Sequence, residues 1–571
     1  MTNKFLFLLL VIFLFSACEN TEVADTIFLN GDFYTVNKNQ PRATAIAIKN
    51  GRIIGIGNDE IQQKFSGENT ELKDLNGAFA MPGFIEGHAH FSGLGNSLMN
   101  LNFLKSKNWN EIVSMVEERA KTAKKGEWIT GRGWHQEKWN ETPKKQVLGY
   151  PYHYELSDIS PDNPVVLRHA SGHSLFANKA AMDLVGISIE TPNPIGGEIV
   201  RGDNKEAIGV FEETAMDAFQ DAYDAHLLTL SPEENEERWY KSIELAEQNC
   251  LENGITSFQD AGSTFIELDR YEKMAEAGEL DVRLWAMIGA REENLAEGAK
   301  NFPVIDAGDN FFTCRAIKAY ADGALGAFGA WMLKPYNDKP DAHGQNVTPI
   351  PDLKRVAALS FDNDLQMCIH AIGDRANRLV LDIYEENFNR DTTKNDLRWR
   401  IEHAQHINPK DIPRFKEMGV IASMQGIHCT SDAPFVEKRL GTERARTGAY
   451  PWRSLLDAGV VIANGTDAPV EDISAIESFY ASVTRKRADT GMEFFPEQRM
   501  TRAEAIHSYT LGNAFAAFEE ANKGSLEVGK LADLVVLSKD LEKCADEEVL
   551  ETEILMTVVG GEVKFEKEAR N

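Results

Sequence analysis

The sequence predicts an α/β protein: a (β/α)8 TIM-like barrel with an inserted subdomain, plus a small β-sandwich composed of N- and C-terminal segments. Two observations predict this class. Through the middle of the chain, short apolar segments alternate with long helical segments, which is typical of parallel β/α units. Both ends of the chain instead carry short β runs around tight turns, which is typical of antiparallel hairpins.

Composition excludes several classes of protein. The 571 residues include 60 Lys and Arg against 89 Asp and Glu, a net charge of −29. Nucleic acid is not an expected partner, because phosphate binding needs clustered cations. Beyond the N-terminus no apolar run reaches the roughly 18 residues of a membrane-spanning helix, which excludes a multi-pass membrane protein. The six cysteines are widely spaced, so no disulfide framework is predicted.

The first residues are typical of an export signal. Lys4 precedes an unbroken apolar run over residues 5–15, and the small residues Ser16 and Ala17 then lead to Cys18. This order resembles a bacterial lipoprotein cleavage box, in which the cysteine becomes the lipidated first residue of the mature chain. The alternative is an ordinary secretory signal with an incidental cysteine.

The lipoprotein interpretation divides the start of the chain into two parts. Residues 1–17 are then the signal peptide, and residues 18–23 are a tether behind the lipidated Cys18. We therefore expect a protein of the bacterial cell envelope that faces the periplasm or the exterior. Its membrane contact would be the lipid anchor alone.

The two ends are expected to form one composite β-sandwich, from residues 24–80 and 524–571. Asn-Gly pairs at residues 30–31 and 50–51 separate β runs in the first segment, and a Gly-Gly pair at 560–561 does so in the second. Two β-rich ends around a long middle segment predict one small sandwich assembled from both.

Residues 81–523 are expected to form the barrel. The predicted strands occupy residues 84–90, 255–260, 282–288, 316–321, 366–371, 399–404, 420–425 and 460–466. The helix before the second strand is the clearest, because Ser231 and Pro232 are typical of a helix start and Asn253-Gly254 of a helix end. The interval between the first two strands is far longer than one crossover, so we expect an inserted subdomain at about residues 101–220.

Residues that bind metals stand at the ends of four of these strands. His88 and His90 close the first strand, His370 the fifth, His403 the sixth and Asp467 the eighth. Strand side chains alternate, so the first two histidines face the same side. The carboxyl ends of barrel strands meet at one face, and imidazole and carboxylate groups bind divalent ions. The pattern therefore predicts a metal centre at that face.

This order of segments resembles the amidohydrolase superfamily, and within it the YtcJ-like branch (the amidohydrolase 3 family) of metal-dependent hydrolases. The resemblance covers about residues 25–566 and rests on the segments MPGFIEGHAHF, IKAYADGALG, CIHAIGDRAN, RIEHAQ, NGTDAPV and GSLEVGKLADLVVL. It implies a distorted barrel and a sandwich built from both termini, which agrees with the elements predicted above.

The resemblance also implies the roles of the ligands. His88 and His90 match the pair that holds one metal together with Asp467, and His370 and His403 match the ligands of a second metal. The cofactor expected is one or two divalent metal ions, with zinc as the first choice.

Lys318 matches a lysine that becomes N-carboxylated and bridges both metals. A bare ammonium would repel a dication, whereas a carbamate is an anion with two oxygens. The alternative is an ion pair between Lys318 and Asp322, which lies four residues later on the same strand face.

Four residues are candidates for substrate binding. Trp134 and His135 lie in the insertion, as does His173, and the corresponding motifs of the family approach the active site. Asp322 is the fourth. For His173 a purely structural, hydrogen-bonded role is the alternative.

The expected activity is hydrolysis of a non-peptide C–N bond, amide or formamide-like, in a small-molecule substrate. A metal-activated hydroxide would attack the carbonyl, and Asp467 would pass the proton of the water to the leaving amine. Two alternatives stay open: a binuclear ester or phosphoester hydrolase, and a catalytically inactive binding lipoprotein with the same fold. The expected assembly is a homodimer.

Overall fold

The computed structural model describes residues 22–58, 60–136, 139–170, 174–195, 197–290, 294–326 and 328–568. The expected signal peptide with Cys18 and the candidate His173 lie outside the described residues. No helix in the described part combines the length and apolar character needed to cross a bilayer.

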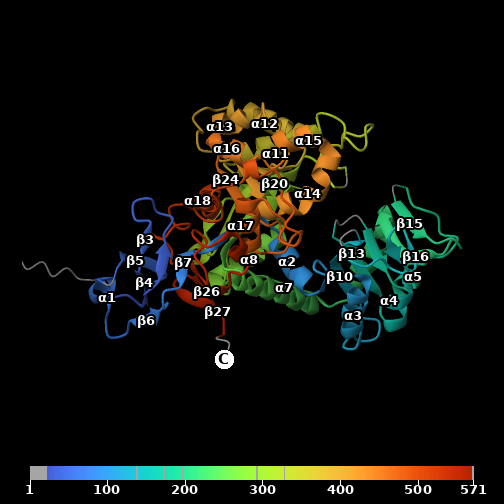
Figure 1. Ribbon diagram of the computed structural model, residues 1–571, viewed down its shortest axis with the longest axis horizontal. Coiled ribbons are helices and arrows are strands. Elements are labelled where there is room, and N and C mark those ends of the chain that lie inside the picture. The colour runs from blue at the N-terminus through green and yellow to red at the C-terminus, as the bar shows by residue number, and fades with distance from the viewer. Residues whose placement is uncertain are drawn as a thin grey trace, which may run out of the picture.

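Eight parallel strands form a nearly closed barrel at the centre of the molecule (Figure 1). In order around the sheet they are β8 (Phe84–Ala89), β17 (Ile255–Ser263), β18 (Arg283–Gly289), β20 (Phe312–Tyr320), β21 (Gln366–Ala371), β22 (Arg400–His403), β23 (Ile421–Gln425) and β24 (Ile462–Gly465). These are the eight predicted segments, with ends that differ by a few residues, so the predicted fold class is confirmed. A short strand, β19 (Val304–Asp306), pairs antiparallel with β20.

Helices cover the outside of the barrel. They include α2 (Phe91–Leu98), α7 (Pro232–Glu252), α8 (Phe265–Ala277), α11 (Ile350–Asp362), α12 (Asp374–Phe388), α13 (Ile412–Met418), α14 (Gly426–Leu440), α15 (Thr442–Gly448), α16 (Trp452–Asp457), α17 (Ala475–Thr484), α18 (Arg502–Ser508) and α19 (Leu511–Ala516). Helix α7 begins with the predicted capping box, in which Ser231 and Glu234 satisfy each other's backbone amides, and it ends at Asn253.

The inserted subdomain has a six-stranded sheet of its own. Its strands, in spatial order, are β15 (Gly197–Arg201), β16 (Ala207–Glu213), β14 (Ser174–Ala177), β13 (Val165–His169), β10 (Ile129–Trp134) and β9 (Leu101–Asn102). Its helices are α3 (Trp109–Ala120), α4 (Tyr154–Ile159), α5 (Lys179–Leu184) and α6 (Asp217–Leu227). The chain enters it from α2 and returns through α7, and these two helices pack together (Figure 1).

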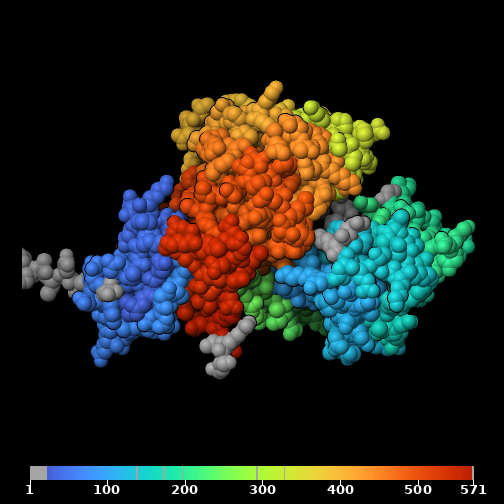
Figure 2. All heavy atoms as spheres, viewed as in Figure 1, coloured from blue at the N-terminus to red at the C-terminus, as the bar shows by residue number. Residues whose placement is uncertain are grey.

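The sandwich consists of two sheets. One contains β5 (Arg52–Gly57), β4 (Ala45–Lys49), β1 (Thr26–Leu29) and β6 (Glu71–Asp74). The other joins both ends of the chain through β27 (Glu562–Glu566), β26 (Ile554–Val559), β25 (Leu534–Leu537), β7 (Phe79–Pro82), β2 (Asp32–Tyr34) and β3 (Arg42–Ala43). In the space-filling view the sandwich and the insertion are lobes on opposite sides of the barrel (Figure 2).

A buried ion pair joins the sandwich to the barrel. Arg283, at the start of β18, donates to Asp533 over 2.8 Å, and both side chains are almost completely buried. Asp533 also accepts the backbone amide of Gly560 over 2.8 Å. A charged pair without water must be fully hydrogen-bonded to be tolerated, and these contacts meet that condition.

The barrel closes between β8 and β24 through the side chain of Asn513. Its Nδ2 donates to the carbonyl oxygens of Ile85 (2.5 Å) and Asn464 (2.7 Å), and its Oδ1 accepts the amide of Asn464 (2.9 Å). Buried backbone groups need such partners. The fit is tight, because a Cβ added at Gly87 would lie 2.5 Å from the Asn513 Oδ1.

At the carboxyl end of the same seam, backbone hydrogen bonds join the two strands directly. The amide of Asp467 donates to the carbonyl of His88, and that of His90 to the carbonyl of Ala468, each over 2.8 Å. The seam therefore fixes the separation of His88 and Asp467, which are far apart in the sequence.

We predict that Asn513→Ala destabilises the protein strongly. The substitution leaves three buried backbone groups without a partner, and each costs about 1–3 kcal/mol, so the free energy of unfolding should fall by about 3 kcal/mol or more. Urea denaturation measures this. Asn389→Ala is the control, since Asn389 is exposed on the barrel surface, and a similar loss in both variants would contradict a special role for the seam.

Candidate metal centre

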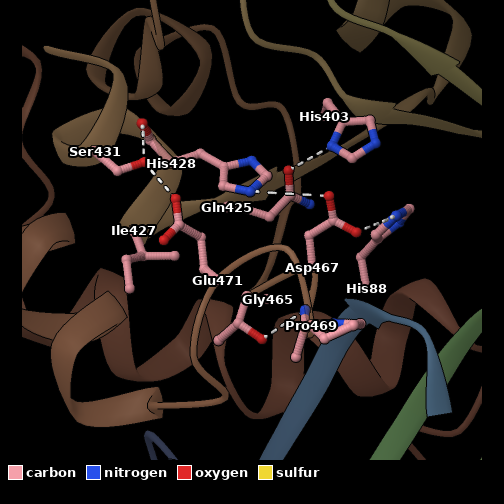
Figure 3. A network of polar contacts seen from close by, with 12 residues as sticks. His88, His403, Gln425, Ile427, His428, Ser431, Gly465, Asp467, Pro469 and Glu471 are labelled. Carbon is pink, nitrogen blue, oxygen red and sulfur yellow. Dashed lines mark hydrogen bonds and ion pairs between the residues drawn. The ribbon is translucent and has the colours of Figure 1, made fainter. Parts of the chain in front are cut away.

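Strands β8, β22 and β24 bring His88, His403 and Asp467 together at the carboxyl end of the barrel. One ligand atom from each of the three lies within 4.8 Å of the others, and all three residues are buried. Figure 3 shows the His88 and Asp467 side chains directed at each other, with His403 beside them. All three are among the predicted ligands, although the resemblance assigned His403 to a second ion rather than to the ion of His88 and Asp467.

His90 and His370 extend the cluster on either side. The Nε2 atom of His90 lies 3.3 Å from Asp467 Oδ1, compared with 3.7 Å for the Nε2 atom of His88. The ring of His403 lies close to those of both His88 and His370: its centroid is 4.7 Å from that of His88 and 4.5 Å from that of His370. His90 is 32% exposed while His88 is fully buried, so the centre opens to solvent on the His90 side.

Lys318 lies beneath the imidazoles, near the end of β20. Its side chain is buried, with Nζ 3.4 Å from the Nε2 of His88 and 4.7 Å from the ring centroid of Tyr320. No carboxylate of the described residues forms an ion pair with it. The lysine therefore lies next to the candidate ligand His88 and has no counter-ion among the described residues.

Asp322 does not form the ion pair with Lys318 that was the alternative to carboxylation, because three backbone amides occupy its carboxylate. Its carboxylate accepts the backbone amides of Trp331 (2.7 Å), Ile372 (2.9 Å) and Gly373 (2.8 Å). These amides belong to the loops that follow β20 and β21. Burial raises the pKa of Asp322 to about 7. The residue holds the two loops together beside His370, whose Nε2 is 3.5 Å away.

Trp134, one of the candidates in the insertion, is placed differently from our expectation. Trp134 is fully buried in the core of the insertion, where its indole donates to the carbonyl of Leu167 over 2.8 Å. It is therefore not available to a substrate, because a strand that alternates in and out turns it towards that core. His135 follows it and packs against His169, with ring centroids 4.4 Å apart.

A buried chain of polar groups orients the histidines. Glu402 bonds the Nδ1 of His88, and Arg400 donates to both oxygens of Glu402, over 2.7 and 2.9 Å. Gln425 Oε1 lies 2.8 Å from the Nδ1 of His403. In both histidines the Nδ1 atom is hydrogen-bonded, so the Nε2 atom is free to face the cluster, as in metal-binding histidines.

Burial keeps the imidazoles neutral. It lowers the pKa of His88 to about 4 and of His370 to about 3, with the Lys318 ammonium adding to both effects, and it lowers the pKa of His403 as well. Burial alone would raise the pKa of Asp467, but its close contact with His90 and the nearby imidazoles outweigh that effect and hold the pKa well below its usual range. Neutral imidazoles beside an ionised carboxylate are the protonation states that a metal needs.

The unsatisfied atoms of the cluster also fit a metal. Asp467 Oδ1 and His370 Nε2 are buried and have no hydrogen-bond partner among the described residues. Buried polar atoms without partners are rare, and where several converge they indicate an absent ion or ligand. The donor set of nitrogen and oxygen atoms suits a divalent transition metal.

Two residues near the centre escaped the sequence analysis. His428, in the first turn of α14, points at Asp467 from the end of the seventh strand, with its Nε2 3.8 Å from Oδ2 (Figure 3). It lies three residues beyond the end of β23, so the strand-end rule passed over it. Arg132 of the insertion donates to the carbonyls of Pro469 and, over 3.3 Å, of Ala170. No sequence pattern signals that contact.

The chain is similar to known proteins over most of its length. The family model described as "Amidohydrolase family" matches residues 71–565. Protein LONG AFTER FAR-RED 3 of Arabidopsis thaliana is 31% identical, covering 94% of this chain and 91% of its own. The putative amidohydrolase YtcJ of Bacillus subtilis is 29% identical, covering 95% and 99%. The N-substituted formamide deformylase of Arthrobacter pascens is 27% identical, covering 96% and 99%.

Solved structures show the same architecture. An uncharacterised metal-dependent hydrolase from Pyrococcus horikoshii superposes with a TM-score of 0.72 and 25% sequence identity, covering 91% of this chain and 99% of that one. A second such hydrolase, from Pyrococcus furiosus, gives a TM-score of 0.70 at 25% identity, covering 91% and 100%.

We predict that metal affinity falls less steeply as the pH drops from about 7.5 to about 5.5 than it would at a site made only of exposed histidines. Protons compete with a metal for an imidazole only near its pKa, and that of His88 is about 4 rather than the usual 6.5. Competition with a chromophoric zinc chelator, corrected for the chelator's own protonation, measures the affinity.

Glu402→Gln is the matched variant for this experiment, because it removes the carboxylate that orients His88 without removing a candidate ligand. It should weaken binding by about 10–100-fold. An affinity of the unaltered protein that falls about a hundredfold per pH unit below pH 6.5 would show that more than one imidazole titrates normally there.

Proposed function

The chain belongs to the amidohydrolase family, and we propose that it hydrolyses a non-peptide C–N bond, amide or formamide-like, in a small molecule. The observation that carries the proposal is the convergence of His88, His403 and Asp467, with ligand atoms within 4.8 Å of one another. The similarity to an N-substituted formamide deformylase over nearly the full length of both chains supports the choice of bond.

His88, His90 and Asp467 would hold one divalent ion, and His370 and His403 a second. When bound, such ions supply an activated water as nucleophile and polarise the carbonyl under attack. We propose zinc, because imidazole and carboxylate ligands in a buried site suit it well.

Asp467 is the residue we propose to move the proton. It is ionised when the reaction starts, because its pKa is held well below the usual range, so it can accept the proton of the attacking water. It can then deliver that proton to the leaving nitrogen, which must be protonated to depart as an amine. The candidate ligands His370 and His403 are not free for this task.

Lys318 is proposed to be N-carboxylated in the active protein. A buried ammonium 3.4 Å from an imidazole, with no acidic partner among the described residues, is an unfavourable arrangement. Carboxylation replaces the positive charge with a negative one and adds two oxygen atoms that can bind metal. This favours two ions rather than one.

We also propose that the mature chain begins at Cys18 and is anchored by lipid to the bacterial cell envelope, facing the periplasm or the exterior. The support is the order of charged, apolar and small residues that precede this cysteine. The homodimer stays a prediction.

We predict that metal-reconstituted protein releases amine from at least one class in a panel of N-formyl amines, N-acyl amines and cyclic amides, and that His88→Ala abolishes this turnover. Loss of a direct ligand should cost more than the 10–100-fold typical of a supporting residue. His226→Ala is the control, because His226 lies in the last turn of α6 in the insertion.

The same samples test the metal centre. Metal analysis should find two ions per chain in the unaltered protein and one in Lys318→Ala. Absence of bound metal after growth in zinc-replete medium would contradict the centre, and turnover of esters without any amide would contradict the C–N specificity. Retained turnover in His88→Ala would remove that residue from the site.

We predict that Cys18→Ala abolishes lipid labelling. Expressed in a bacterial host with radiolabelled palmitate, the unaltered chain should carry label and remain with the membrane fraction after a salt wash. The variant should be unlabelled. Cys544→Ala is the matched control, since Cys544 is the half-buried cysteine of the C-terminal segment. Equal labelling of Cys18→Ala and the unaltered chain would contradict the anchor.

A further inference from the structure

The ring of His428 carries a buried nitrogen with no partner. The residue is 7% exposed, and its Nε2 makes no hydrogen bond with the described residues. The nearest acidic atom is Asp467 Oδ2 at 3.8 Å, which is too long for a hydrogen bond. A buried polar atom left unpaired costs about 1–3 kcal/mol, so such an atom needs an explanation.

The other ring nitrogen determines what this one can do. Gln405 Nε2 lies 3.3 Å from the Nδ1 of His428, so its amide donates to Nδ1, which must then be an acceptor. A neutral imidazole with an accepting Nδ1 carries its proton on Nε2. His428 therefore presents an N–H group, rather than a lone pair, to the centre.

The backbone holds this group in place. Helix α14 begins directly after β23, and its first amides are tied to neighbouring elements: Gly426 N donates to Asn464 Oδ1 over 2.9 Å, and Ile427 N to Ser478 Oγ over 3.2 Å. The ring lies nearly parallel to that of His403, with centroids 6.1 Å apart. Figure 3 shows it directed at Asp467 from the side opposite His88.

We propose that His428 is a further catalytic residue, whose Nε2–H donates a hydrogen bond to the oxygen of the scissile carbonyl group. This inference rests on the proposed function. An acceptor is missing at this position, and the carbonyl oxygen is the substrate atom that gains negative charge during attack. A donor already held in position stabilises that charge without reorganisation, which is worth about 10²–10³ in rate.

The test compares two substitutions at His428. Asn keeps a group that can bond Gln405 but does not reach the Nε2 position, whereas Gln can place an amide N–H there. With the best substrate of the amide panel, we expect His428→Asn to lower kcat about 10²–10³-fold. KM should change only a few-fold, and His428→Gln should recover at least a tenth of the wild-type rate.

His406→Asn is the matched control. His406 is equally buried, its two ring nitrogens also lack partners among the described residues, and it packs against Tyr450 rather than the metal centre. It should keep kcat within about threefold of wild type. Bound metal and the unfolding temperature of His428→Asn should match those of wild type.

A sulfur-for-oxygen exchange identifies the atom that His428 contacts. The amide substrate is compared with its thioamide, in which sulfur replaces the carbonyl oxygen. Sulfur is a poor hydrogen-bond acceptor, so the fall in kcat caused by His428→Asn should be much smaller with the thioamide than with the amide. Equal losses on the two substrates would overturn the assignment to the carbonyl oxygen. So would a kcat for His428→Asn within threefold of wild type, or loss of metal from that variant, which would make His428 a ligand.

The proposed role of His428 can be tested even if the proposed hydrolysis of a C–N bond fails. If the wild-type protein hydrolyses esters alone, the proposed function fails, and the same variants are compared on an ester. If it hydrolyses nothing, calorimetric titration of the zinc-loaded protein with formate decides. At least tenfold weaker binding by His428→Asn than by wild type supports the proposal, and equal binding overturns it.

Discussion

The hydrogen bonds between β8 and β24 determine the geometry on which the site depends. They join the first and last strands of the barrel, so that His88 and Asp467 lie in contact although most of the barrel sequence separates them. Ordinary strand pairing alone does not close this side. The Asn513 side chain and the buried Glu86, which accepts the amide and hydroxyl of Thr466 over 2.8 and 2.9 Å, complete the closure.

A buried ion pair orients the ring of His88 towards the metal centre. The Arg400–Glu402 pair lies within one strand and has no exposure to solvent, and its carboxylate bonds His88. Removing either partner would leave an unpaired charge in a dry interior, which is far more costly than replacing both. The arrangement is therefore stable only as a whole, and it keeps one nitrogen of His88 free for the centre.

The sequence predicted the barrel and five of the candidate ligands because both follow from short-range rules, whereas Lys318 followed only from the resemblance to a family. Apolar runs and turn residues locate the strands, and the fixed face at which parallel strands end brings His370 and His403 to His88. The predictions that failed concern side chains whose surroundings are set by long-range contacts. Nothing near Asp322 shows that three amides from two loops occupy its carboxylate, and nothing near Trp134 shows which face of its strand is covered. His428 was missed because it lies in a helix, three residues beyond the strand end.

The continuity of β7 and β8 has a consequence for how the molecule is made. Only Gly83 separates the two strands, so the sandwich strand positions the start of the strand that carries His88. The partner of β7 on one side is β25, which spans Leu534–Leu537. On a ribosome, these residues emerge long after every candidate ligand. The centre therefore gains its final support only after β25 has been made, and a nascent chain stalled earlier would expose the open edge of β7 to other chains.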